Sequence, residues 1–308
     1  MKKHLLASSL LVLALSFHSF AQNTFRGTWS AEVRGTSVQI QTRFQSAHSN
    51  YGNSFDMSRA EMKSGATANS VQFAVVRDAG TFNYTGNLNG ELGSGFVDFV
   101  ANPEFAKGMA ELGYPNLSEE DVFRLANVDV NRQFVRDLGQ VGYSHLTLEE
   151  VRRLKIHDAG PDFIRAMAVA GYKDLKPEEL VRLRIHDITP EYISEMRSQN
   201  LGDLGTEDLV RLRIHDVDPQ FVKAVRQLGF TSIGSEELVR MKIHDVTPEF
   251  VAKLKQLGFQ DVSPEELVRL RIHDVTPDYI EKAKSGRQGI SLEEIIRMKV
   301  HGGREARL

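Results

Sequence analysis

The chain has 308 residues, with 38 Lys and Arg against 41 Asp and Glu, a formal net charge of −3 and no cysteine. Basic and acidic residues are interleaved along the chain, which argues against a nucleic acid as partner. Without cysteine the protein has no disulfide and no cysteine-linked lipid, so packing alone must hold its fold. This length is typical of two domains.

Residues 1–21 predict a secretory signal peptide. Lys2 and Lys3 precede an apolar stretch over 5–17, and Ser19-Phe20-Ala21 is a small-x-small cleavage site. The stretch of about 13 residues is shorter than the roughly 20 that a membrane-spanning helix needs, although an uncleaved anchor is the alternative. We therefore expect export to the periplasm or the extracellular medium, with no stable membrane insertion after cleavage.

Residues 22–100 predict a small antiparallel β domain. Apolar residues alternate with period two from Trp29 to Val33, from Val38 to Phe44, from Val71 to Val75 and from Phe82 to Tyr84. Turn signals stand at 34–35, 78–80, 89–90 and 93–95. We expect about six strands, joined as a meander into a small sandwich or a flattened barrel.

Aromatic residues of this domain are candidates for a binding face. They are Trp29, Tyr51 and Phe55. Aromatic residues in so small a β domain are more often core residues, which is the alternative.

Residues 101–303 predict an α-helical repeat array, followed by a short tail over 304–308. Aromatic residues recur there at a constant spacing of 29, at Phe105, Phe134, Phe163, Tyr192, Phe221, Phe250 and Tyr279. Such a constant period is the signature of stacked repeats. Seven units follow from it.

A second landmark lies eight residues after each aromatic residue. It is Gly113, Gly142, Gly171, Asn200, Gly229 and Gly258, with Gly286 one residue early in a shortened last unit. Gly, and to a lesser degree Asn, adopts the left-handed conformation that commonly follows the end of a helix. Each unit therefore contains a first helix that runs from before the aromatic residue to this landmark.

A second helix follows in each unit. Ser263-Pro264-Glu265-Glu266 is a capping box, and Thr247-Pro248 starts the first helix of the same unit. We expect Leu267, Val268, Leu270 and Ile272 to form the apolar face of the second helix, and Glu265 to pair with Arg269 on its exposed face. The predicted fold is α+β, with a β domain followed by an α-solenoid-like array, and a closed helical globule is the alternative.

These motifs carry a resemblance to a known family. The run Glu-Leu-Val-Arg-Leu-Arg-Ile-His-Asp-Val-Thr-Pro, which ends with small variations at positions 190, 248 and 277, resembles repeats of bacterial envelope proteins. With Gly27-Thr28-Trp29 and Ala79-Gly80-Thr81-Phe82 it is similar to the C-terminal extensions of membrane zinc metallopeptidases of the beta-lactam sensor and antirepressor type. No His here is followed by Glu, so the peptidase motif His-Glu-x-x-His is absent. The resemblance implies a sensor-like or adaptor-like part without the protease.

A row of histidines is the candidate for metal or acid-base chemistry. It comprises His157, His186, His215, His244, His273 and His301, and the first five precede Asp. Equivalent residues of stacked units lie roughly 8 to 10 Å apart, too far to share one zinc ion. We therefore interpret each His as a helix-ending residue and each Asp as part of the turn that follows.

Arginines recur on the second helices as a candidate binding surface, at Arg182, Arg211, Arg240 and Arg269. Glu residues three and four positions earlier are expected to neutralise them. No phosphate loop, nucleophile elbow or paired carboxylate set is present in the sequence, and we expect no cofactor. The sequence thus favours a non-enzymatic binding or scaffold protein of the envelope whose partner is a protein or peptide. The alternative is a hydrolase or metal-binding protein, with its site at the domain junction or at the His-Asp positions.

Overall fold

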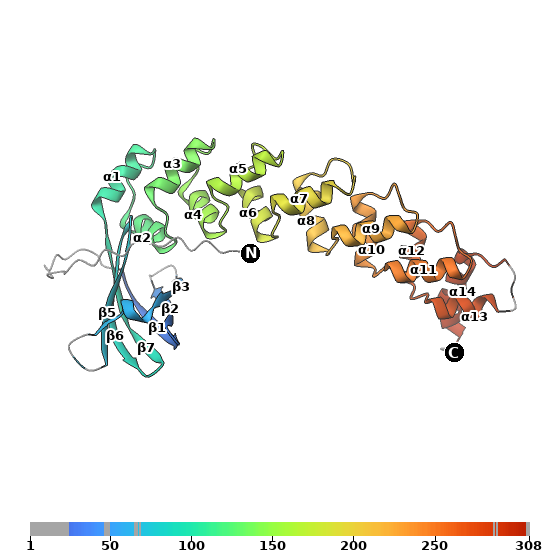
Figure 1. The fold of residues 1–308 in the computed structure, drawn as a ribbon, viewed down its shortest axis with the longest axis horizontal. Coiled ribbons are helices and arrows are strands. Elements are labelled where there is room, and N and C mark those ends of the chain that lie inside the picture. The colour runs from blue at the N-terminus through green and yellow to red at the C-terminus, as the bar shows by residue number, and fades with distance from the viewer. Residues whose placement is uncertain are drawn as a thin grey trace. The chain divides into compact units, whose positions relative to one another are not determined.

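The computed structural model describes residues 25–45, 50–64, 67, 69–285, 287 and 289–305, with side chains as far as residue 301. The expected signal peptide, Gly286 and residues 306–308 lie outside these ranges. The described chain is an antiparallel sheet followed by fourteen α-helices, so the α+β fold class is confirmed (Figure 1). It divides into two compact units, Met1–Ile164 and Arg165–Leu308, which are described separately.

One seven-stranded sheet makes up the first part of unit 1, in the order β3-β2-β1-β7-β6-β5-β4. The strands are β1 (Phe25–Arg34), β2 (Ser37–Gln45), β3 (Asn50–Ser58), β4 (Lys63–Ser64), β5 (Ser70–Arg77), β6 (Gly80–Asn89) and β7 (Leu92–Ala101), with a 3-10 turn at Arg59–Glu61. All neighbours pair antiparallel. Six long strands and one of two residues thus form a curled sheet with β3 and β4 at its edges, rather than a sandwich.

Alternation places one side of β1 and β2 in the core, as the period-two pattern predicts. Val38, Ile40, Thr42 and Phe44 of β2 are buried, and the residues between them are not. Trp29 of β1 is only 2% exposed and its ring packs edge-on against Phe73 and Tyr84. Trp29 therefore belongs to the core and is not part of a binding surface.

The predicted turn at 93–95 is wrong, because Gly93 and Gly95 lie inside strand β7. A Cβ atom at Gly95 would come 2.0 Å from the carbonyl oxygen of Thr85 and 2.8 Å from Nε1 of Trp29. The same indole nitrogen donates to the Thr85 carbonyl at 3.1 Å. The glycines are therefore needed to admit the Trp29 indole, rather than to turn the chain.

Four complete helices follow in unit 1: α1 (Pro103–Glu111), α2 (Glu119–Asn127), α3 (Arg132–Gln140) and α4 (Leu148–Ile156). No tether separates sheet from helix, because Asn102 alone stands between β7 and α1. Its side chain accepts from the Glu104 amide at 3.1 Å and donates to the Asp78 carbonyl at 2.9 Å. The first helix of the array is thus capped by a residue that is fastened to the sheet.

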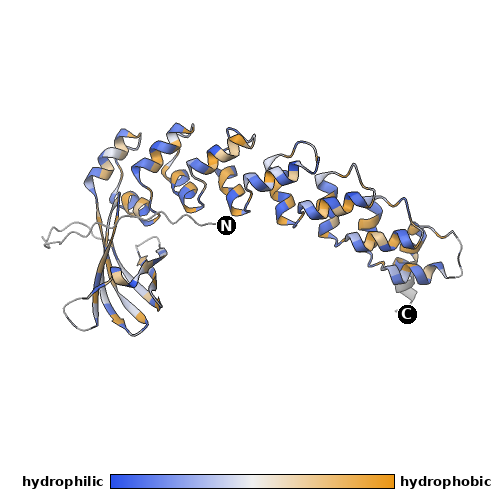
Figure 2. Cartoon of the chain, in the orientation of Figure 1, coloured by the Kyte–Doolittle hydropathy of each residue, from blue (hydrophilic) through white to orange (hydrophobic). Residues whose placement is uncertain are grey.

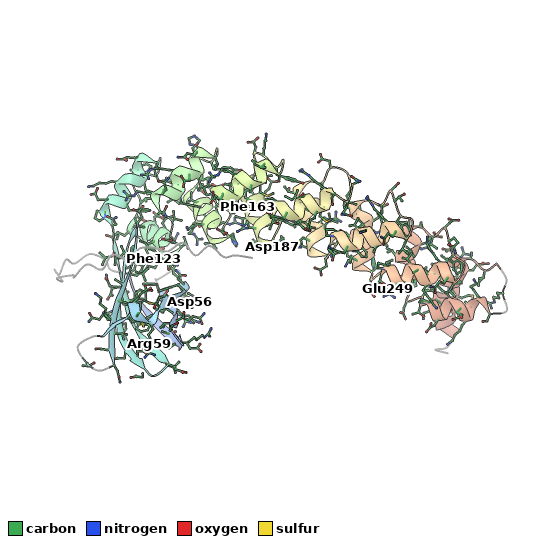
Figure 3. The ribbon with its side chains drawn as sticks, viewed as in Figure 1. Asp56, Arg59, Phe123, Phe163, Asp187 and Glu249 are labelled. Carbon is green, nitrogen blue, oxygen red and sulfur yellow. The ribbon has the colours of Figure 1, made fainter. Side chains whose placement is uncertain are left out.

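Helix α2 supplies the residue that completes the core of unit 1. Phe123 is fully buried, and Figure 3 labels it where this helix meets the sheet. Its ring packs against five other aromatic rings at centroid distances of 4.5 to 6.3 Å, those of Phe25, Phe44, Tyr51, Phe82 and Phe99. Sheet and helix therefore share one apolar core.

The carboxyl end of α2 is also held by the sheet. Asn53 of β3 donates to the Asn127 carbonyl at 2.8 Å, and Nη1 of Arg77 on β5 donates to the same oxygen at 2.9 Å and to the Ala126 carbonyl. A cation at this end of a helix is favoured by the helix dipole. Burial lowers the pKa of Arg77, and nearby Asp129 partly offsets that effect.

The boundary between the units falls within α5 (Pro161–Val169). The helices of unit 2 that follow are α6 (Pro177–Ile185), α7 (Pro190–Arg197), α8 (Thr206–Ile214), α9 (Pro219–Gln227), α10 (Ser235–Ile243), α11 (Pro248–Gln256), α12 (Pro264–Ile272), α13 (Pro277–Lys284) and α14 (Leu292–Glu305). Odd-numbered helices are the first helices of the repeats and even-numbered ones the second. α9, α11 and α13 pack side by side, and so do α6, α8, α10, α12 and α14. Each helix has a hydrophobic and a hydrophilic side (Figure 2).

The helix ends have the geometry that the sequence landmarks predict. Backbone φ is between 95° and 102° at Gly113, Gly142, Gly171, Gly229 and Gly258, and 50° at Asn200. The predicted capping boxes are present, since the Ser263 hydroxyl accepts from the Glu266 amide while the Glu266 carboxylate accepts from the Ser263 amide. Most of the aromatic row is buried, with Phe134 and Tyr279 only half-buried.

Candidate functional site

The surface formed by the second helices of unit 2 is the candidate site. We define the second-helix surface as Arg182, Arg211, Arg240 and Arg269 with Ile185, Ile214, Ile243 and Ile272. In each helix the Ile stands three residues after the Arg, so both side chains lie on one side. The surface thus repeats one arginine and one isoleucine per unit.

The isoleucines are exposed, which corrects the expected apolar face. Leu267, Val268 and Leu270 are buried as predicted, but Ile272 is 53% exposed. Its equivalents Ile185, Ile214 and Ile243 are 56%, 47% and 52% exposed, and Ile156 of unit 1 is exposed as well. Each is the last residue of its helix, beyond the buried positions that pack on neighbouring helices.

Arginines of this surface pair with glutamates of the following unit. Nη1 of Arg182 lies 2.7 Å from Oε2 of Glu207, and Nη2 of Arg269 lies 2.8 Å from Oε2 of Glu293. The expectation that Glu residues three or four positions earlier neutralise them is therefore wrong for these two arginines, including the Glu265 to Arg269 pair. The physical reason is that the glutamate of the adjacent second helix lies opposite the guanidinium.

Arg211 and Arg240 differ from their equivalents. Their guanidinium groups form no ion pair or hydrogen bond within the part of the chain that the structure describes, and neither do the carboxylates of Glu236 and Glu265 that stand at the matching positions. All four side chains are exposed. The middle of unit 2 therefore offers free donors and acceptors.

A shallow groove of about 260 Å³ lies beside one of these open positions. Glu237 and Arg240 of α10 line it on one side, and Ser263, Pro264, Glu265 and Val268 line it from the start of α12. The Glu237 carboxylate accepts from the Gly234 amide at 2.7 Å and so caps α10. Arg240 and Glu265 are the groove residues with unused hydrogen-bonding capacity.

The histidine row ends the second helices through the backbone. His157, His186, His215, His244 and His273 are the C-cap residues, and their side chains are half-buried. Their imidazoles make no hydrogen bond among the described residues. The helix ends are thus satisfied by main-chain bonds such as His215 N to Arg211 O, at 3.2 Å.

The aspartate after each histidine is the residue in the left-handed conformation, which sequence reasoning missed. Backbone φ is 50° to 53° at Asp158, Asp187, Asp216, Asp245 and Asp274. The next residue then donates back to the helix, as Val217 N does to Leu212 O at 2.8 Å. This is a Schellman motif with Asp in the place that Gly usually takes. The aspartates also form ion pairs with basic side chains of the next unit, as Asp187 (labelled in Figure 3) does with Arg213.

No three His, Asp or Glu side chains in the described ranges are grouped so that they could hold a metal ion. His301, at the end of the row, is exposed. No helix in the described part of the chain is long and apolar enough to cross a bilayer.

Tyr51 and Phe55, the other two aromatic candidates of the β domain, are half-buried, and the Phe55 ring packs edge-on against Tyr84. Tyr51 also forms hydrogen bonds with α2. Its hydroxyl donates to Glu120 Oε1 at 2.8 Å and accepts from Nε of Arg124 at 2.8 Å. These contacts fasten β3 to α2. They also hold the pKa of Glu120 below its ordinary value, because both partners hydrogen-bond to the carboxylate.

Comparisons with known proteins add no relative to this description. No protein-family model matches the chain, and no curated protein matches it either.

Proposed function

We propose that this chain is a non-enzymatic binding or scaffold protein of the bacterial envelope, and that it binds a protein or peptide through its helical repeats. Export to the periplasm or the medium follows from the pattern of residues 1–21. A role as sensor or regulatory adaptor follows from the resemblance of its repeats to the extensions of sensor metallopeptidases. The proposal includes no cofactor and no reaction.

The observation that supports binding is the exposure of Ile185, Ile214, Ile243 and Ile272 at equivalent positions of successive second helices. A single exposed isoleucine needs no explanation, whereas an isoleucine exposed at the same position of four successive second helices is a regular apolar feature of the kind found at interaction sites. Repeat arrays extend such a row by one residue per unit, and so provide long binding surfaces.

Affinity capture tests this function. The purified protein is immobilised, incubated with an envelope extract, and compared with a variant that carries Ile214→Ser and Ile243→Ser. We expect at least one protein to be retained by the parent and lost from the double variant. The matched control is Val169→Ser, because Val169 is 91% exposed on a first helix and lies outside the second-helix surface. Equal retention by all three proteins would contradict the proposed surface, and no retention above empty resin would contradict the function.

In this proposal the histidines of the row end the second helices and bind no metal. Purified protein should then contain no stoichiometric transition metal after dialysis, and its helicity should persist in chelator. Elemental analysis that finds one or more bound metal ions per chain would contradict this role and favour the metal-binding alternative.

A further inference from the structure

The open positions of the second-helix surface define what kind of group can bind there. Arg182 and Arg269 are closed by Glu207 and Glu293, whereas Arg240 and Glu265 face the groove between α10 and α12 without a partner among the described residues. A guanidinium only donates hydrogen bonds and a carboxylate only accepts them. The groove therefore suits a neutral group that carries both an acceptor and a donor.

A peptide group has these two functions. Its carbonyl can accept from Arg240 while a neighbouring N–H donates to Glu265. A charged group fits less well, because the residue that attracts it stands opposite one that repels it. The apolar Pro264 and Val268 in the groove wall likewise favour an uncharged occupant.

The spacing of the exposed isoleucines sets the conformation of this occupant. Neighbouring packed helices lie about 8 to 10 Å apart. A chain in the extended polyproline II conformation advances about 3.1 Å per residue and has three residues per turn, so every third side chain points to the same side and lies about one helix spacing further on. A peptide that crosses α8, α10 and α12 can thus place every third side chain against Ile214, Ile243 and Ile272.

We propose that the second-helix surface from α8 to α12 binds an extended, uncharged segment of a partner protein, with an apolar side chain at every third position. Its backbone occupies the groove between Arg240 and Glu265, and its apolar side chains cover the isoleucines. The inference rests on the proposed function and specifies its ligand class and its site.

A defined peptide tests this inference. The probe is a fluorescent 12-residue peptide with Leu at every third position and Ser or Thr elsewhere, and its binding to the purified protein is measured by fluorescence anisotropy. A second peptide of the same composition with its leucines adjacent is the comparison. We expect the spaced probe to bind the parent protein and the clustered peptide to bind at least about tenfold more weakly.

Matched variants locate the site. Arg240→Ala and Ile243→Ser should each weaken binding of the spaced probe about tenfold, since one removes the donor and the other the apolar contact. Arg136→Ala is the control for the arginine, because Arg136 is exposed on α3 outside the second-helix surface and its guanidinium already donates to Gln133, and Val169→Ser is the control for the aliphatic side chain. Both controls should bind within about twofold of the parent. All four side chains are exposed, so the variants should keep the parent's helical circular dichroism.

Three results would overturn the inference: no binding of the spaced probe, equal binding of both peptides, or unchanged binding by Arg240→Ala and Ile243→Ser. Sedimentation velocity adds a fourth. If the parent forms a dimer that Ile243→Ser abolishes, the occupant is a second copy of this chain and not an extended peptide. In each of these cases a partner captured from the envelope extract would leave the proposed function standing, so the two failures are distinguishable.

Discussion

Nη2 of Arg213 donates to Oδ2 of Asp187 at 2.9 Å, across the boundary between two successive repeats. Asp187 is the residue with positive φ that ends one second helix, and Arg213 belongs to the next. Arg271 with Asp245 and Lys299 with Asp274 repeat this relationship. The Asp187 side chain is 73% exposed, so each pair contributes only about 0 to 1 kcal/mol. We infer that these pairs align neighbouring units, while the buried apolar residues supply most of the stability.

Glycines at the ends of the first helices are predicted to be required because their backbone φ is positive. Gly229→Val should lower the free energy of unfolding by more than about 1 kcal/mol, because a β-branched residue is strained at a φ of 102°. Space is not the cause, since a Cβ there would meet only Nζ of Lys255 at 3.6 Å. Asn200→Gly is the matched change and should be neutral or stabilising. Urea denaturation measures both, and a destabilised Asn200→Gly variant would count against the repeat register.

Phe123→Ala should be the most damaging single truncation in unit 1. It removes a fully buried ring that contacts five others, so we expect a loss of about 3 to 5 kcal/mol. Trp29 is the only tryptophan and lies within the same sheet, so its fluorescence reports the unfolding of that sheet. Phe134→Ala, at a half-buried position of the repeat row, is the control and should cost less. Equal losses would show that sheet and α2 do not share a core.

Tyr192 and Tyr172 should respond differently to removal of the hydroxyl. The buried Tyr192 hydroxyl has no hydrogen-bond partner among the residues that the structure describes, whereas the Tyr172 hydroxyl donates to the Leu204 carbonyl at 2.6 Å. Tyr192→Phe should therefore be neutral or stabilising, and Tyr172→Phe should cost about 0.5 to 1.5 kcal/mol. Burial also raises the pKa of Tyr192 to about 12. Thermal unfolding of both variants checks the pair, and a strongly destabilised Tyr192→Phe would reveal a partner for this hydroxyl.

The ion pair of Asp78 and Arg132 should make the free energy of unfolding depend on pH in the acid range. Hydrogen bonds from the Arg132 side chain hold the pKa of Asp78 below its ordinary value of 3.8. Because the folded-state pKa is the lower one, the stabilisation is fully present above the unfolded-state pKa and is lost as pH falls through the folded-state pKa. Asp78→Asn should thus be less stable than the parent at pH 7, and the difference should shrink below about pH 4.

Denaturant titrations of both proteins from pH 7 to pH 2 measure this difference. Glu104→Gln provides the comparison, because the Glu104 pair with Lys107 is exposed and should contribute less than about 0.5 kcal/mol at any pH. A difference between Asp78→Asn and the parent that persists undiminished at pH 2 would show that Asp78 does not act through its charge.

Local signals predicted the repeats well. The spacing of 29 and the caps fix where each short helix begins and ends, and these depend on residues only a few positions apart. Long-range packing could not be predicted in the same way. Gly93 and Gly95 resemble a turn until Trp29 is known to need their space, and Phe123 gives no sign that its ring enters a sheet formed by distant residues.

The candidate site was predicted only in part. The arginine row follows from the repeat, but its pairing partners lie in the next unit, which helix periodicity does not show. Ile272 belongs to the apolar pattern and is nevertheless exposed, because it is the last residue of its helix. The periodic pattern identifies a helix face, whereas exposure also depends on where neighbouring helices stop.

Amide hydrogen exchange with a captured partner tests most directly that this protein binds through its second helices. If this protein binds as proposed, the partner should slow amide exchange in α8, α10 and α12 and leave amide exchange in strands β1–β7 unchanged. Ile243→Ser should abolish that protection at the same partner concentration. Protection confined to the sheet, or protection that survives Ile243→Ser, would contradict the account.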